Sequence, residues 1–134
     1  MALNPKLAVA RRNAALNAAL DTVLDGGFLR IYDGAQPTDA DEAIGAQVLL
    51  AELTLNATAF AAASGGSKAA NAITSDSSAN ATGTATWGSL VTSGGTRLFD
   101  FSVGSSGANL NLNTVSIVAS ATVSCSAFTV TMAA

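Results

Sequence analysis

The feature that most constrains the fold is a series of strand-like segments in the second half of the chain, separated by glycine-rich turns. The turns are Ser64-Gly65-Gly66-Ser67 and Ser93-Gly94-Gly95-Thr96. Strands are predicted around them over residues 69–74, 82–92, 97–103, 110–117 and 122–132. Short strands at roughly ten-residue spacing, with turn residues between them, are typical of an antiparallel β-sandwich or jelly roll.

Alternation along these strands predicts which side chains face the core. The inward residues are expected to be Phe99, Phe101 and Val103 in one strand and Phe128, Val130 and Met132 in the last. Cys125, the only cysteine, alternates with Val123 in the last strand and has no partner for a disulfide within the chain. We interpret it as a small buried apolar residue.

The N-terminal segment predicts one helix over residues 6–24. Its apolar stripe has the i, i+4, i+7, i+8 spacing of an amphipathic helix and consists of Leu16, Leu20, Val23 and Leu24. Pro5 suits the first turn, and Gly26-Gly27 supplies residues that end a helix. The expected fold class is therefore mainly β, with one N-terminal α-helix.

Two further strand-like segments follow this helix. Residues 28–32 and 48–55 are predicted strands, and in the second the inward residues are expected to be Leu49, Ala51, Leu53 and Leu55. Asp33-Gly34 turns the chain into an acidic loop over residues 35–47. One helical turn is expected in this loop, with Thr38 or Asp39 as its cap and Glu42 behind it.

Length and composition limit the possible classes of protein. The 134 residues suit one domain, residues 1–134, with an N-terminal arm and helix over 1–27 and a β-sandwich over 28–134. Charged residues make up 11% of the chain, against about 25% in ordinary domains, so a free monomer would have an unusually neutral surface. The net charge of −3 and six basic residues argue against nucleic acid as a partner. No apolar run predicts a membrane helix or a signal peptide, so we expect no membrane partner and assembly in a cytosol.

The sequence contains no pattern that indicates catalysis, a metal site or a cofactor site. Histidine is absent, and no lysine stands at Ser-x-x-Lys spacing. The densest acidic cluster, Asp33, Asp39, Asp41 and Glu42, offers oxygen ligands for Ca²⁺ but lacks the spacing of an EF-hand. The alternative is a solvated acidic loop or a charge patch that faces a basic partner. We therefore expect no enzyme activity, no catalytic residue, no metal and no cofactor.

Several isolated residues can be interpreted either as structural residues or as contact residues. Trp87 is interpreted as a core residue of its strand, with a contact anchor as the alternative. Asp76 is expected to make local hydrogen bonds from its side chain to the backbone. Arg30 and Arg97 are expected to pair with Glu52 or Asp100 across the sheet, or to reach an acidic surface outside it.

Three segments resemble a widespread group of small tailed-bacteriophage virion proteins that are often encoded with head genes. They are LRIYDGAQPTDAD at residues 29–41, AITSDSSAxATGTATW at 72–87 and VGxxGAxLNLN at 103–113, where x marks positions outside the resemblance. This resemblance implies a capsid decoration, or cement, protein that lies on the outer virion surface. Its expected partners are the major capsid protein and further copies of itself, as a dimer or trimer.

Contact residues are predicted from charge and expected exposure. They are Arg11 and Arg12 in the N-terminal helix and Asp33, Asp39, Asp41 and Glu42 in the acidic loop. Two other roles compete with capsid decoration. One is a tail, neck or fibre-base component, and the other is a carbohydrate-binding module that uses Trp87 and Tyr32 as stacking platforms.

Overall fold

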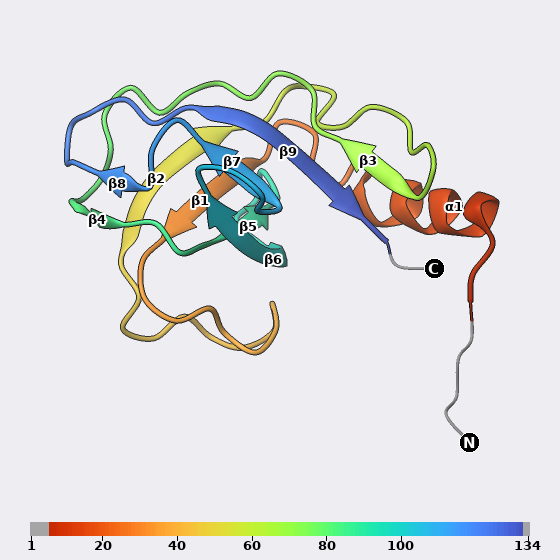
Figure 1. Ribbon diagram of the computed structural model, residues 1–134, viewed down its shortest axis with the longest axis horizontal. Helices are drawn as coiled ribbons and strands as arrows, with labels where there is room; N and C mark the ends of the chain where they lie inside the picture. Colours follow the sequence, from red (N-terminus) through yellow and green to blue (C-terminus); the bar gives the residue numbers. More distant parts are fainter. Residues whose placement is uncertain (1–5, 133–134) are drawn as a thin grey trace.

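The computed structural model describes residues 6–132 as a mainly β fold with one N-terminal helix (Figure 1), which confirms the expected fold class. The elements in chain order are α1 Val9–Leu20, β1 Phe28–Tyr32, β2 Leu49–Thr54, β3 Ser67–Ala69, β4 Gly83–Thr84, β5 Trp87–Val91, β6 Arg97–Gly104, β7 Leu110–Leu112, β8 Ser116–Ile117 and β9 Cys125–Thr131. Seven strands form one sheet in the order β2-β1-β5-β6-β7-β9-β3, and β4 pairs with β8 in a second sheet. Every pairing is antiparallel except β6 with β7.

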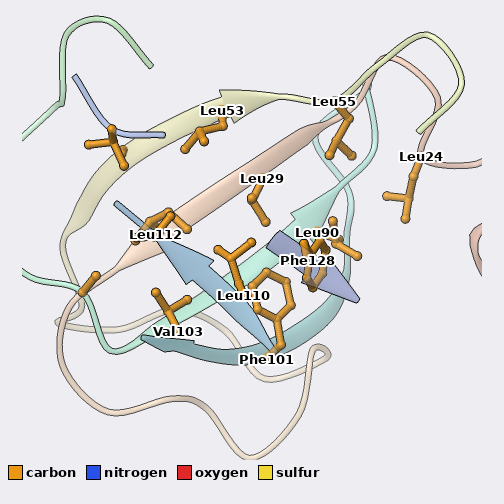
Figure 2. Packing of buried hydrophobic residues seen from close by; sticks show 14 of the residues in the cluster. Leu24, Leu29, Leu53, Leu55, Leu90, Phe101, Val103, Leu110, Leu112 and Phe128 are labelled. Carbon is orange, nitrogen blue, oxygen red and sulfur yellow. The ribbon is translucent and has the colours of Figure 1, made fainter. Parts of the chain in front are cut away.

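The large sheet curls around its own core, so that β1, β2 and β5 lie across from β7 and β9 (Figure 2). Leucines and phenylalanines from both sides fill the space between, among them Leu29, Leu90, Leu110, Phe101 and Phe128. The rings of Phe101 and Phe128 have centroids 4.7 Å apart. One continuous sheet thus supplies both walls of a packing like that of a sandwich.

The first two predicted strands form, with one error in the predicted face. β1 coincides with the predicted strand, and Ala51, Leu53 and Leu55 are buried as expected. Leu49, however, is only half-buried, and its neighbour Leu50 is fully buried. The reason is a β-bulge: the pairing with β1 skips one residue at Leu50, which inverts the alternation of side chains at that point.

The later strands are shorter than predicted. The predicted strand over 82–92 is split into β4 and β5, and the one over 110–117 into β7 and β8. Residues 70–74, predicted as strand, form only isolated bridges, and β3 ends at Ala69. β6 and β9 match their predictions closely, and Phe101, Val103, Phe128 and Val130 are buried as expected. Phe99, also expected to face inward, is exposed at the end of the core.

The helix is shorter than the predicted range of 6–24. Leu16 and Leu20 are buried as predicted, but the helix ends at Leu20, and Thr22 has a φ of 61°. Beyond that turn Val23 is exposed, contrary to the predicted stripe, whereas Leu24 still reaches the core. Pro5, like the rest of residues 1–5, lies outside the described residues.

Candidate interaction surface

A polar stripe on α1 attaches the helix to the segment around β3. Asn13, Asn17 and Asp21 follow one another at four-residue spacing, so their side chains lie on one face. Asn13 Oδ1 accepts a hydrogen bond from the backbone N–H of Gly66 at 2.9 Å, and Asn17 Oδ1 accepts one from Ala63 at 3.0 Å. The stripe thus satisfies backbone donors of the turn before β3, beside the buried leucines.

Lys68 of β3 also attaches α1 to this segment, because its ammonium contacts two residues of the polar stripe. Its side chain is 0% exposed, and its ammonium donates to Asn17 Oδ1 at 2.8 Å and pairs with Asp21 Oδ1 at 2.5 Å. A buried ammonium is costly unless it is paired and hydrogen-bonded, so these two contacts are what allow a lysine at this position.

The two predicted contact arginines have different environments. Arg11 is exposed on α1 and is available to a partner. Arg12 is half-buried, its Nε donates to the carbonyl oxygen of Leu7 at 3.1 Å, and its guanidinium covers Gly66. Gly66 has a φ of 81°, which favours glycine, and a Cβ there would also lie 2.6 Å from an Arg12 nitrogen. Arg12 therefore takes part in holding the helix, and Arg11 is the residue that faces outward.

The acidic loop closes on itself without forming a helical turn. Asp39 Oδ1 accepts hydrogen bonds from the backbone N–H groups of Asp41 and Glu42, at 3.0 and 3.1 Å. Glu42 Oε2 accepts one from the N–H of Thr38 at 2.6 Å. Asp39 is therefore the residue that caps this turn, as expected, but Glu42 accepts from the N–H of Thr38 and not from that of Asp39, so the reciprocal pair of a capping box is incomplete. The segment stays a turn, and the predicted helical turn does not form.

Asp33 belongs to the base of the loop. Its Oδ1 accepts a hydrogen bond from the N–H of Val48 at 2.6 Å, and its carbonyl oxygen accepts one from Trp87 Nε1 at 3.0 Å. Asp33 and Glu42 border a shallow hollow of about 460 Å³ beneath the loop. Of the four predicted acidic contact residues, Asp39, Asp41 and Glu42 are exposed, while Asp33 is half-buried.

Arg97 fastens the loop to the outer face of the sheet. Its guanidinium donates to the carbonyl oxygens of Glu42 at 2.7 Å and Asp39 at 2.9 Å. It also makes two hydrogen bonds to Asp100, each 2.9 Å, and lies 5.9 Å from the centroid of the Trp87 ring. The hydrogen bonds to Asp100 raise the pKa of the guanidinium above its already high ordinary value. Arg97 thus pairs with Asp100, one of the two expected carboxylates, but the pair lies within β6 and not across the sheet as expected.

A second predicted ion pair lies on the same outer face. Arg30 Nε donates to Glu52 Oε2 at 2.7 Å, across the β1–β2 pair. This contact raises the pKa of Arg30 and confirms the predicted pairing with Glu52. Asp76 accepts the expected local hydrogen bond, from the N–H of Ser78. Its other carboxylate oxygen accepts a hydrogen bond from the N–H of Glu52 in β2, which is the edge strand of the large sheet.

The aromatic residues proposed as sugar platforms are inside the molecule. Trp87 is fully buried and stacks on Tyr32 with ring centroids 4.6 Å apart and planes 13° apart. Tyr32 is buried as well. The core reading of Trp87 is confirmed, and neither ring is exposed for stacking against a sugar.

Exposed apolar side chains mark surfaces that sequence reasoning missed. In the described residues they occur at four separate places: Leu7, Val9 and Val23 around α1, Val48 just before β2, Leu98 and Phe99 on β6, and Val118 after β8. β8 and α1 lie at opposite ends of the molecule, with β6 between them (Figure 1). The acidic loop, the orange segment below β1 in Figure 1, is also remote from α1, so the two predicted contact regions do not form one site.

Next to the exposed Leu98 and Phe99, part of the backbone of β6 has no neighbouring strand on one side. β6 pairs with β5 along its length, but with β7 only at Val103 and Gly104. Within residues 6–132, the outer edge of residues 97–101 has no backbone hydrogen bond to another segment. Leu98 and Phe99, 39% and 38% exposed, lie on this open edge. An open edge with apolar side chains is a surface on which another chain can add a strand.

Between Lys6 and Met132, no three acidic or cysteine side chains come close enough to hold a metal ion. No helix in that part of the chain is long and apolar enough to span a membrane. Cys125 is half-buried rather than fully buried, and burial raises the pKa of its thiol to about 11.

Comparisons with protein-family models, with curated proteins and with solved structures find no match for this chain.

Proposed function

We propose that this chain is a non-enzymatic structural protein of a tailed-bacteriophage virion that decorates the capsid. It binds the outer surface of the major capsid protein lattice as a dimer or trimer and stabilises the shell against internal pressure. The phage identity rests on the resemblance of residues 29–41, 72–87 and 103–113 to small head-gene virion proteins. The physical properties of the surface support the general class, a protein that works by contact with other chains.

The observation that carries the proposal is the distribution of apolar exposure. Large apolar side chains are exposed around α1, on the open edge of β6 and at Val118, which is 57% exposed. A protein at a junction of a lattice contacts several neighbours at once, and it needs more than one such surface. Many copies on one lattice multiply weak contacts into strong overall attachment.

The charges of the molecule are arranged in a way that suits such contacts. Six charged side chains are paired with one another in the ion pairs Arg30–Glu52, Lys68–Asp21 and Arg97–Asp100. The surface that remains is rich in small neutral residues, which pack closely without leaving charges buried and unpaired. Arg11 on the helix and Asp41 on the loop are exposed charges that we assign to partner contacts.

The copy number of the protein in purified virions tests the proposal. Quantitative mass spectrometry should give a ratio to the major capsid protein between about one-third and one, because lattice-wide avidity requires a copy at each repeated junction. A ratio of a few per cent would contradict decoration and support a tail, neck or fibre-base position instead. Absence from the particle would overturn the virion proposal.

Substitutions on the β6 edge and on the helix test these two surfaces separately, by the amount of protein bound to capsids. Leu98→Lys on the open edge of β6 and Arg11→Glu on the helix should each lower the amount bound to capsids without changing thermal stability, since both side chains are exposed. Thr129→Lys, at an exposed polar position on β9, is the matched control. Normal binding by both substituted proteins would show that these surfaces do not contact the capsid.

A further inference from the structure

Lys68, Asn17 and Asp21 form a cluster that ion pairing alone does not account for. The Lys68 side chain is fully buried, yet its ammonium contacts both the carboxamide of Asn17 in α1 and the carboxylate of Asp21, which follows the last residue of α1. A methionine or leucine would fill the same space without the cost of a buried charge. The arrangement instead brings together a nucleophile, an electrophile and a proton carrier.

The distances suit attack by the amine on the Asn17 carboxamide. Lys68 Nζ lies 2.8 Å from Asn17 Oδ1. Because a carbonyl bond is about 1.2 Å long, the carbonyl carbon is within about 4 Å of Nζ. Near-attack distances are about 3–3.5 Å, so only a small shift separates the observed contact from a reactive one.

The carboxamide is also polarised by a second donor. The backbone N–H of Ala63 donates to the same oxygen, Asn17 Oδ1, at 3.0 Å. Attack on the carbonyl carbon places negative charge on this oxygen, and a fixed backbone donor stabilises that charge. Ala63 is thus positioned as an oxyanion donor for acyl transfer at Asn17.

Asp21 supplies the proton transfers. Its Oδ1 is 2.5 Å from Lys68 Nζ, which is within reach to accept a proton from the ammonium. An amine must lose its proton before it acts as a nucleophile. The Asp21 side chain is 48% exposed, so it can also exchange protons with water.

We propose that Lys68 and Asn17 join in an intramolecular isopeptide bond. The ammonium gives a proton to the Asp21 carboxylate, and the neutral amine attacks the carbonyl carbon of Asn17. The C–N bond to the side-chain amide nitrogen then breaks, and that nitrogen takes the proton from Asp21 and the second proton lost by Nζ, so it leaves as ammonium and carries away the positive charge of the lysine. An amide links the two side chains, the mass of the neutral chain falls by one ammonia, and no oxidant or reductant is needed.

The bond joins the helix permanently to the sheet. In the described residues the main contact of α1 with a strand is with β3, where Asn17 and Asp21 hold the Lys68 ammonium. A covalent link at the centre of that interface removes the possibility that the helix detaches. This inference is independent of the proposed virion role.

Intact mass spectrometry of the purified full chain tests the proposal. We expect a mass lower by one ammonia molecule than the sequence predicts, after allowance for the initiator methionine. Trypsin should then release residues 13–30 joined to residues 31–97, because a linked Lys68 is not cleaved. The joined peptide distinguishes the isopeptide from a succinimide, which has the same mass.

Three substitutions should restore the unmodified mass: Lys68→Met, Asn17→Ala and Asp21→Ala. The matched control is Asn13→Ala, which removes a neighbouring hydrogen bond to Gly66 but leaves the cluster intact, and it should keep the lower mass. A folded wild-type protein of full mass, or a lower mass that survives Lys68→Met, would overturn the proposal. Loss of water instead of ammonia would place the bond at Asp21 and would also overturn it.

Discussion

Ser89 has a buried hydroxyl group without a hydrogen-bond partner in the described structure. It lies on β5 between Arg30 and Asp100 in the cross-strand register, is fully buried, and its Oγ has no hydrogen-bond partner in the described structure. A buried polar group without a partner costs free energy. We expect Ser89→Ala to raise the free energy of unfolding by about 1 kcal/mol, measured by urea titration. Ser102→Ala, whose hydroxyl bonds to Asn109, is the control and should not stabilise.

Arg97 compensates a buried carboxylate. The Asp100 side chain is 3% exposed and receives two hydrogen bonds from Arg97. Removal of one partner of a buried ion pair leaves an uncompensated charge, so Arg97→Ala should lower the free energy of unfolding by about 3 kcal/mol. The double variant Arg97→Ala/Asp100→Ala should recover part of this loss in the same denaturation assay. A loss equal to the sum of both single changes would contradict a specific pair.

Cys125 is expected to be a slow thiol. Burial raises its pKa from 9.0 to about 11, so at pH 8 the thiolate fraction, and the labelling rate by a disulfide reagent, should be about 100-fold below those of a free cysteine. The unfolded chain ionises this thiol at lower pH than the folded chain does. The stability that this shift contributes is present below about pH 9 and is lost as the pH rises through about 11. Labelling at the rate of the unfolded protein at pH 8 would contradict the burial.

At the scale of elements, one close backbone contact fixes the path from the helix to β1. A Cβ at Gly27 would lie closer to the carbonyl oxygen of Val91 than real side chains do. Because that oxygen belongs to the backbone of β5, it cannot move aside cheaply. Gly27→Ala should cost about 2–3 kcal/mol by thermal or urea unfolding. Gly94→Ala, in an open turn with no atom nearer than 3.8 Å, should change stability by less than about 0.5 kcal/mol.

The sequence predicts those elements whose signals are local. β1 is bounded by glycines and alternates cleanly, and it forms as expected. The split of residues 82–92 has no such signal, because neither Ala85 nor Thr86 breaks a strand. The break arises from two different neighbours: the N–H of Ala85 donates to Val115 beside the small sheet, and that of Thr86 to Tyr32 of the large sheet. Only the assembled fold brings these partners together.

The candidate interaction surfaces likewise contain some residues that local sequence signals identify and others that come together only in the assembled fold. The capping residues of the acidic loop could be identified because Thr38, Asp39 and Glu42 are close in sequence. Lys68 and Asn17 are distant in sequence, and no spacing links them before β3 and α1 meet. The four-residue spacing of Asn13, Asn17 and Asp21 was the available signal, but it is identical to that of a solvated helix face. The bulges at Leu50 and near Leu98 leave no trace in the pattern of apolar residues.

At the scale of the whole molecule, the C-terminal strand supports the N-terminal helix. α1 contacts β3, and β3 pairs with β9. A charge in the core at Val130 of β9 should therefore expose amides of α1 to hydrogen exchange as well as those of β9. We expect Val130→Asp to lower stability by more than about 2 kcal/mol and to remove protection from both elements together. Thr129→Asp, exposed on the same strand, should leave the exchange of α1 unchanged.

The position of β9 within the large sheet has a consequence for synthesis. The strand translated last lies between β7 and β3, not at an edge of the sheet. While β9 is still held in the ribosome, β3 has no partner strand, and the face on which the helix will lie is incomplete. Each nascent chain therefore keeps its core open until β9 has emerged, and during that interval chaperones and neighbouring nascent chains have access to the leucines that the folded protein hides.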